Sequence, residues 1–414
     1  MLKQLQESFL LRGTTNKMKR AICLGLTILI LCSSFLPTFA YDGGTVLKLY
    51  NNDPIENADY KSYAIINCIS DTVLEEKNAD NKQPIGNLVK MMTLLLVFDA
   101  IHSEKLSMTQ ELKAPEGIKQ YGQGNSAFMT AGEKQTVENL IKAVCVNSAN
   151  DAALTLALSL AKSEGQFVKM MNDKAKELGM TNTHFADCTG LERSNAQCST
   201  ARDMARLAYK LVTDYPKVTE YTAEKRMEFW HSGSKKNKLY TNNTFIHYYS
   251  KATGLCATKG ETTGFCLAGS ATVGEENFVV VVLGAADDNN ALVVGKKLIE
   301  ICAKKYDYVT IDVKGTYIRQ IAVKNGKEKT VKAETGDNFE AFVKVEDKDK
   351  VEKTVVPNEV NEAPIKEGDV LGKIVYSANG IELGTVDIVA AEEMKKANIF
   401  VRFFRWFLSL FGLE

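Results

Sequence analysis

Two short stretches of the chain hold residues that could do acid–base or nucleophilic chemistry. The first places Asn87 and Lys90 three positions apart at the start of an apolar run. The second places Ser148 and Asn150 two positions apart between two helical patterns. A buried lysine tends to lose its proton, and the neutral amine is a competent general base. These four residues are therefore the first candidates for a functional site.

The helix expected after Pro84 should be buried on every side. Residues 91–98 are all apolar except for one threonine, and a helix that is apolar all round packs inside a protein. Lys90 would then be buried, unless its side chain extends from the first turn to the surface. Asn87 is also a good N-cap residue, so an alternative is that it only starts this helix.

Ser148 and Asn150 fall in a turn between two predicted helices, one over residues 136–146 and one that starts near Ala152. Such a turn can project both side chains into a cleft. The alternative is an ordinary helix-to-helix turn in which Asp151 caps the second helix.

The composition is that of a globular chain long enough for two domains. It has 414 residues, 45% hydrophobic and 25% charged, with a formal net charge of zero. That balance argues against a nucleic-acid partner, and no basic stripe with interleaved aromatic residues is visible. Helical and strand-like runs alternate to about residue 306, and short alternating strands follow. We predict an α+β domain over 41–306 and a small β-sandwich over 307–391.

The first forty residues predict export. Lys17, Lys19 and Arg20 come directly before an apolar run over 21–35, and residues 37–40 offer a small-residue cleavage site. This pattern is typical of a secretory signal peptide, here residues 1–40. The true start could be Met1 or Met18.

The cysteines and histidines predict neither a disulfide framework nor a metal site. Seven cysteines follow the leader, at positions 68, 145, 188, 198, 256, 266 and 302. An odd number in a large chain is not the pattern of a disulfide-stapled fold. A Cys188–Cys198 or a Cys256–Cys266 bridge stays open, and Cys145 is interpreted as a core residue. No pair has CxxC spacing, so we expect no metal and no cofactor.

The last twenty residues form a different kind of segment. On a helix, Asn398, Arg402, Arg405 and Ser409 make one polar stripe on an aromatic and aliphatic surface. Such a helix lies in a membrane interface. From Ile399 to Leu413 it would be about 22 Å long, shorter than the roughly 30 Å hydrocarbon core. We predict an amphipathic anchor over 392–414 that touches the membrane surface through residues 395–414; the alternative is a helix docked on the protein.

Several stretches, taken in order, resemble the serine-type D-alanyl-D-alanine carboxypeptidases, the low-molecular-mass penicillin-binding proteins. The matching segments are 74–93, 132–133, 147–153, 167–185, 189–191, 199–205 and 363–369. The resemblance implies a penicillin-binding, β-lactamase-like transpeptidase domain, built of an antiparallel sheet with helices, before the β-sandwich and the amphipathic helix. It also implies a peptidoglycan stem peptide ending in D-Ala-D-Ala as substrate, and a place in the cell wall or periplasmic space, at the outer face of the cytoplasmic membrane.

The resemblance implies three catalytic motifs, of which the SxN motif is whole at Ser148 and Asn150. The SxxK motif is half lost, because Lys90 remains as general base while Asn87 stands where the family has its nucleophilic serine. An amide cannot form the acyl-enzyme. Loss of a catalytic serine in a comparable hydrolase costs on the order of 10⁶ in turnover.

The third motif, KTG, is replaced by Cys256, Ala257 and Thr258, by counting back from the strand that follows. Without an ammonium, this strand would bind a peptide carboxylate weakly, and Thr258 would crowd close approach. A slipped register that uses Lys251 or Lys259 could restore a cation, although it breaks the spacing of the motif.

We therefore expect an exported, membrane-associated family member that is inactive or severely impaired and has a wall-binding or regulatory role. The competing hypothesis is an active carboxypeptidase with an altered nucleophile. Ser148 and Cys256 are the candidates, but each would attack from another wall of the cleft and miss the oxyanion donors. A third hypothesis is a binding module for wall polymer or for an active paralogue.

Overall fold

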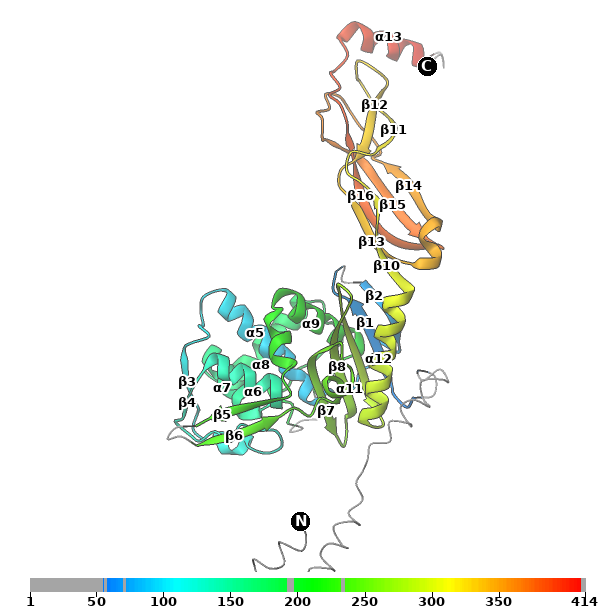
Figure 1. Ribbon diagram of the computed structural model, residues 1–414. Coiled ribbons are helices and arrows are strands. Elements are labelled where there is room, and N and C mark those ends of the chain that lie inside the picture. Colours follow the sequence, from blue (N-terminus) through cyan, green and yellow to red (C-terminus); the bar gives the residue numbers. More distant parts are fainter. Residues whose placement is uncertain (1–54, 56–57, 70–71, 192–196, 232–234, 411–414) are drawn as a thin grey trace, which may run out of the picture. The chain divides into compact units, whose positions relative to one another are not determined.

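The computed structural model describes residues 55, 58–69, 72–191, 197–231 and 235–410 (Figure 1). The predicted signal peptide, residues 1–40, lies outside the described residues. From Ile55 onward the chain forms one compact unit.

An antiparallel sheet with strand order β2-β1-β9-β8-β7 lies at the centre of the larger, N-terminal part. Its strands are β1 (Ser62–Asn67), β2 (Thr72–Lys77), β7 (Ala252–Gly260), β8 (Gly264–Val273) and β9 (Glu276–Ala285). Successive side chains of a strand point to opposite faces. In β9, Val279 and Val281 therefore enter one hydrophobic cluster, and Val280 and Val282 enter another. The sheet is thus covered on both faces.

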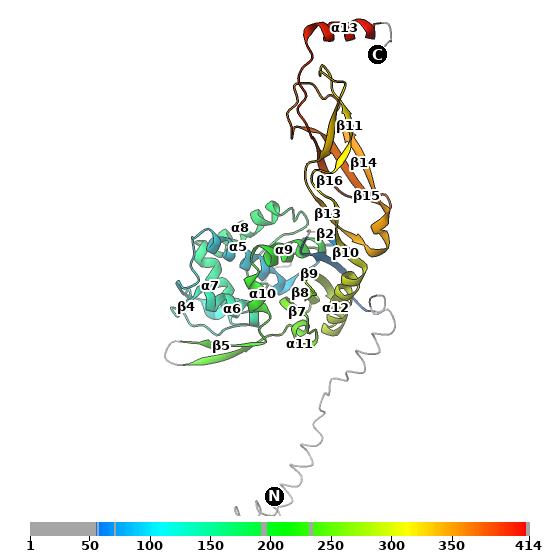
Figure 2. The ribbon, with the colours of Figure 1, turned by 45° about the horizontal axis from the view of Figure 1, so that its top comes forward.

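Helices supply both covering layers (Figures 1 and 2). One face packs on α12 (Asp288–Lys305), and the other packs on α9 (Ala201–Asp214). The remaining helical and short strand elements are η1 (Gly86–Val89), α5 (Lys90–His102), β3 (Glu111–Lys113), η2 (Ile118–Tyr121), β4 (Lys134–Thr136), α6 (Val137–Asn147), α7 (Asn150–Leu160), α8 (Glu164–Glu177), α10 (Lys217–Thr222), β5 (Arg226–Trp230), β6 (Lys236–Tyr240) and α11 (Thr244–Tyr248). The predicted mixture of antiparallel sheet and helices is confirmed.

The cysteines in the described residues are all free, so the two open disulfide pairings are wrong. The register of β7 and β8 gives the physical reason for one of them. Cys256 lies opposite Ala268, whereas Cys266 lies opposite Thr258. Cys145 is buried in the core, as predicted.

The C-terminal part has its own core between two antiparallel sheets. One has the order β11-β12-β16-β15-β14 and the other pairs β10 with β13. The elements are β10 (Tyr306–Asp312), β11 (Tyr317–Ala322), β12 (Thr330–Thr335), β13 (Phe339–Lys344), η3 (Val345–Lys350), β14 (Val351–Pro357), β15 (Val370–Ala378) and β16 (Ile381–Ala390). Ile374 of β15 and Phe339 of β13 both enter this core.

The last helix in the described residues is α13 (Ile399–Ser409), which starts where the amphipathic helix is predicted. Asn398 caps it by accepting a hydrogen bond from the N–H of Val401 at 2.9 Å. Phe400, Phe403 and Phe404 are 81%, 62% and 61% exposed. Within the described part of the chain, no helix has both the length and the hydropathy needed to cross a membrane.

Gly190 shows how tightly one turn packs against the start of η1. Its φ is +76°, and a Cβ there would lie 2.3 Å from the backbone oxygen of Gly86. Gly274 has a similar φ of +65°, but a Cβ there would meet nothing within 4 Å. Both positions have a left-handed φ, but only at Gly190 would a Cβ collide with neighbouring atoms.

We predict that Gly190→Ala lowers the free energy of unfolding by at least about 3 kcal/mol. The new alanine would have a strained φ, and the backbone at Gly86 would also have to move to make room for its Cβ. Gly274→Ala should cost only about 1 kcal/mol, from φ alone. Denaturant unfolding of both variants measures the difference. Equal losses would contradict the packing described here.

Candidate active site

Lys90 is the first residue of α5, and its side chain is buried with 1% exposure. The prediction of a buried lysine is confirmed, and the alternative in which it extends to the surface is wrong. Its Nζ donates a hydrogen bond to Oδ1 of Asn87 at 2.8 Å and another to the backbone oxygen of Thr189. These acceptors replace the water that burial removes.

Asn87 lies inside the short helix η1, whose N-cap position is held by Ile85. The N-cap interpretation of Asn87 is therefore wrong. Its side-chain oxygen accepts from the amine of Lys90 rather than from a helix backbone. Its own N–H donates to Oγ1 of Thr258 at 3.3 Å.

Burial lowers the pKa of Lys90 to about 8. The cause is desolvation of the ammonium, which nearby acidic groups offset only in part. A substantial fraction of the amine is therefore neutral at slightly alkaline pH, as a general base requires.

A turn at Asp187, which the sequence analysis missed, holds the second acceptor of Lys90. The Asp187 carboxylate accepts from the N–H of Thr189 at 2.7 Å and from its hydroxyl at 2.9 Å. It also accepts from the N–H of Gly190. An aspartate two residues before the bonded N–H is the signature of an Asx-turn, so the pattern Asp-x-Thr-Gly was the available signal.

Ser148 ends helix α6 with a left-handed φ of +58°. Its hydroxyl oxygen is buried, and the residue lines the same pocket as Lys90. Asn150 begins α7, but its Nδ2 donates to the backbone oxygen of Gln123 at 2.9 Å. Asn150 is not among the residues that line the pocket, so the structure brings only half of the SxN motif to it.

Asp151 does not cap α7, so that alternative is wrong. The N-cap residue is Ala149, which makes no side-chain cap bond. Asp151 is buried and accepts from the hydroxyl of Ser126 at 2.8 Å and from the N–H groups of Ala127 and Met129, both at 2.9 Å. Its carboxylate therefore holds the preceding loop beside the site, a role the sequence analysis missed.

Strand β7 places Cys256, Ala257 and Thr258 against η1. The Cys256 thiol donates to the backbone oxygen of Asn87 at 3.6 Å. Thr258 is 6% exposed, and its Oγ1 accepts the Asn87 N–H. Burial raises the pKa of Cys256 to about 11, although Lys90 and Ser148 lower it in part. The thiol is thus protonated at neutral pH.

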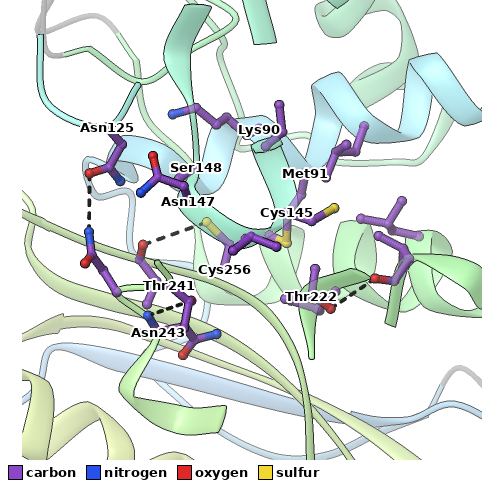
Figure 3. A pocket seen from close by; sticks show the side chains of 18 residues that line it. Lys90, Met91, Asn125, Cys145, Asn147, Ser148, Thr222, Thr241, Asn243 and Cys256 are labelled. Carbon is purple, nitrogen blue, oxygen red and sulfur yellow. Dashed lines mark hydrogen bonds between the residues drawn. The ribbon is translucent and has the colours of Figure 1, made fainter. Parts of the chain in front are cut away.

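Lys90, Ser148, Cys256 and Ala257 come from three different segments and line one pocket (Figure 3). It has room for about 30 Å³ of water, which is enough for one or a few molecules. Neither Lys251 nor Lys259 is among its lining residues, and Lys251 instead pairs with Glu300 at 2.9 Å. The slipped register therefore brings no cation to this pocket. Within the described ranges, no cluster of His, Cys, Asp and Glu could hold a metal ion.

Comparison with known proteins shows the family of this chain. The D-alanyl-D-alanine carboxypeptidase family model matches residues 50–287, and the model of the penicillin-binding protein 5 C-terminal domain matches residues 306–396. The carboxypeptidase DacF of Bacillus subtilis is 30% identical over 346 residues, which are 83% of this chain and 88% of the relative. DacC of Escherichia coli is 30% identical over 376 residues, 86% and 91% of the two chains.

Solved structures show the same fold. Penicillin-binding protein 5 from Haemophilus influenzae matches with a TM-score of 0.71 at 24% identity, over 82% of this chain and 98% of that one. Penicillin-binding protein D2 from Listeria monocytogenes, in a cefotaxime-bound form, matches with 0.52 at 29% identity, over 58% and 96%. The fold is that of the penicillin-binding proteins. Within that class, the chain belongs to the D-alanyl-D-alanine carboxypeptidase family.

We predict that Lys90→Met changes how stability depends on pH. The folded pKa of Lys90 is about 8 and the ordinary value is 10.5. Between these values the unfolded chain holds a proton that the folded chain has lost, so stability of the native protein rises with pH. The advantage of the Met variant should therefore shrink by about 3 kcal/mol from pH 8 to pH 10.5.

Urea unfolding of both proteins across this range measures the difference, and groups common to both cancel. A constant difference between the two proteins would show that Lys90 titrates normally.

Proposed function

We propose that this chain is a catalytically silent member of the carboxypeptidase family that keeps the fold and acts in the wall by binding. The observation that carries the proposal is the hydrogen bond from the Asn87 N–H to the Thr258 hydroxyl at 3.3 Å. This contact indicates that a backbone donor of the site is blocked, in addition to the loss of the nucleophile.

The position of the nucleophile is taken by a group that serves Lys90. The Asn87 side chain accepts from the Lys90 amine at 2.8 Å. An acyl-enzyme needs an attacking oxygen whose proton passes to a base. Asn87 has no such proton and its carbonyl oxygen is already an acceptor, so Lys90 acts here as a structural donor.

The backbone donor beside that position is also occupied. In acyl transfer, backbone N–H groups near the nucleophile stabilise the developing oxyanion. Here the Thr258 hydroxyl lies on the Asn87 N–H, and a Cβ at Gly86 would lie only 2.9 Å from the same oxygen. A substrate carbonyl would have to displace this hydroxyl before it could be polarised.

Replacement of KTG also removes the charge that would bind a terminal carboxylate. Cys256 provides a thiol whose raised pKa keeps it neutral, and a neutral thiol is a poor nucleophile as well as a poor anion ligand. The competing hypothesis of an altered cysteine nucleophile therefore has no support from its surroundings.

The retained role that we propose is contact with the cell wall outside the cytoplasmic membrane. Residues 1–40 would direct export, residues 41–306 would form the carboxypeptidase-like domain and residues 307–391 the β-sandwich. The aromatic surface of α13 suits a membrane interface, so residues 392–414 would hold the protein at that surface. Binding of stem peptides ending in D-Ala-D-Ala would be weak, and an active paralogue would be the partner in this role.

We predict that the purified protein forms no covalent adduct with a labelled penicillin. The combined change Asn87→Ser, Cys256→Lys, Ala257→Thr and Thr258→Gly restores the nucleophile, the cation and the space at the backbone donor, so labelling should appear. Intact-mass spectrometry detects the adduct. Adding Lys90→Ala to the restored variant should abolish labelling again.

Stoichiometric labelling of the native chain would refute the proposal. Absence of labelling in a folded restored variant would refute the assignment of these positions to the two lost motifs.

A further inference from the structure

Strands β5 and β6 form a two-stranded hairpin with two unlike faces. Phe229 and Leu239 are buried in the main core, which anchors the hairpin. The alternate residues point outward in three cross-strand pairs, Arg226 with Tyr240, Glu228 with Lys238 and Trp230 with Lys236. We name these six residues the hairpin face, and all six are exposed.

The hairpin face carries a positive surplus, since three cations accompany one carboxylate. Lys236 pairs with Glu228 at 2.7 Å. The pKa of Glu228 is lowered, first by the hydrogen bond from Lys236 and further by the charges of Lys238 and Arg226. All three cations therefore act on one small area, which favours an anionic ligand.

Two aromatic rings stand at opposite ends of this positive area. Trp230 is 50% exposed and Tyr240 is 53% exposed. The Lys236 ammonium lies 4.6 Å from the centre of the Trp230 ring and leaves much of that ring open to solvent. Tyr240 lies opposite Arg226. Arg226 and Trp230 are four residues apart on β5, so the two rings are separated by about 14 Å along the strand direction. A ligand that covers both rings must be extended, so a polymer fits better than a single sugar.

The hairpin face adjoins the pocket. The backbone oxygen of Tyr240 accepts from Nδ2 of Asn147 at 3.0 Å. Asn147 and the residues that follow Tyr240, Thr241 to Asn243, line the pocket (Figure 3). A polymer laid along the hairpin face would therefore reach the mouth of the former active site.

We infer that the hairpin face binds an anionic wall glycan, with sugar rings packed on Trp230 and Tyr240 and acidic groups on the three cations. This inference rests on the proposed function, because it names the ligand of a wall-binding protein. No basic stripe with interleaved aromatic residues is visible along the linear sequence, because the hairpin face is assembled from two strands. A chain with zero net charge outside the cell favours a wall glycan over a nucleic acid.

Sedimentation with insoluble peptidoglycan tests the inference, using the full chain in a nonionic detergent that covers the aromatic side chains of α13. One sample of the peptidoglycan keeps its phosphodiester-linked polymers and a second is stripped of them by hydrofluoric acid. Trp230→Ala with Tyr240→Ala should weaken binding at least about tenfold. Arg226→Ser with Lys238→Ser should weaken it similarly and reduce its dependence on salt.

A third variant keeps the test sharp if these double variants fold poorly. Glu228→Gln removes the one carboxylate of the face, so binding should tighten. A matched control removes an exposed ring and an exposed cation from the C-terminal part, Tyr317→Ala with Lys373→Ser, and should bind like the native chain.

Loss of binding to the stripped sample would assign the ligand to the phosphodiester polymers, and retained binding would assign it to carboxylates of the peptidoglycan itself. Equal binding of native chain and all hairpin variants would overturn the inference, as would tighter binding to single-stranded oligodeoxythymidylate than to the wall. The penicillin adduct test is independent of these outcomes. If the hairpin face binds no glycan, the proposal that the protein is catalytically inactive still stands.

Discussion

The amine of Lys90 must have acceptors, because it is buried at the start of an apolar helix, and the site is arranged around this need. Oδ1 of Asn87 and the backbone oxygen of Thr189 meet it. The second acceptor is presented by the turn that Asp187 holds, and Gly190 lets that turn approach η1. A serine at position 87 would offer this lysine a proton to remove, whereas Asn87 offers only an oxygen. In the proposed function, Lys90 therefore acts as a structural donor to Asn87 rather than as a base.

Strand β7 completes the change from the other side of the pocket. The family motif would present a long cation and then a residue without a side chain, whereas this chain presents a thiol and then a hydroxyl. The hydroxyl of Thr258 meets the N–H of Asn87 and the thiol of Cys256 meets its carbonyl. The two segments to which the altered motifs are assigned are therefore in direct contact.

The sequence predicted the fold well because its strongest signals are apolar runs that must be buried. The apolar run after Lys90 and the valines of β9 require burial, and the short strands after residue 306 require a second core. Local capping was predicted poorly, because Asn87 and Asp151 are residue types that often cap helices but here accept hydrogen bonds from other groups. Lys90 donates to one, and the loop at Ser126 to Met129 donates to the other. The hairpin face could not be predicted either, since its rings and cations meet only through cross-strand pairing.

The proposed loss of catalytic activity depends most directly on the hydrogen bond between Asn87 and Thr258. Selective ¹⁵N-asparagine labelling allows the hydrogen-exchange rate of the Asn87 amide to be measured in the native chain and in Thr258→Val, which keeps the shape and removes the acceptor. We expect a protected amide in the native chain and exchange roughly tenfold faster in the variant. Equal rates in the two proteins would contradict it.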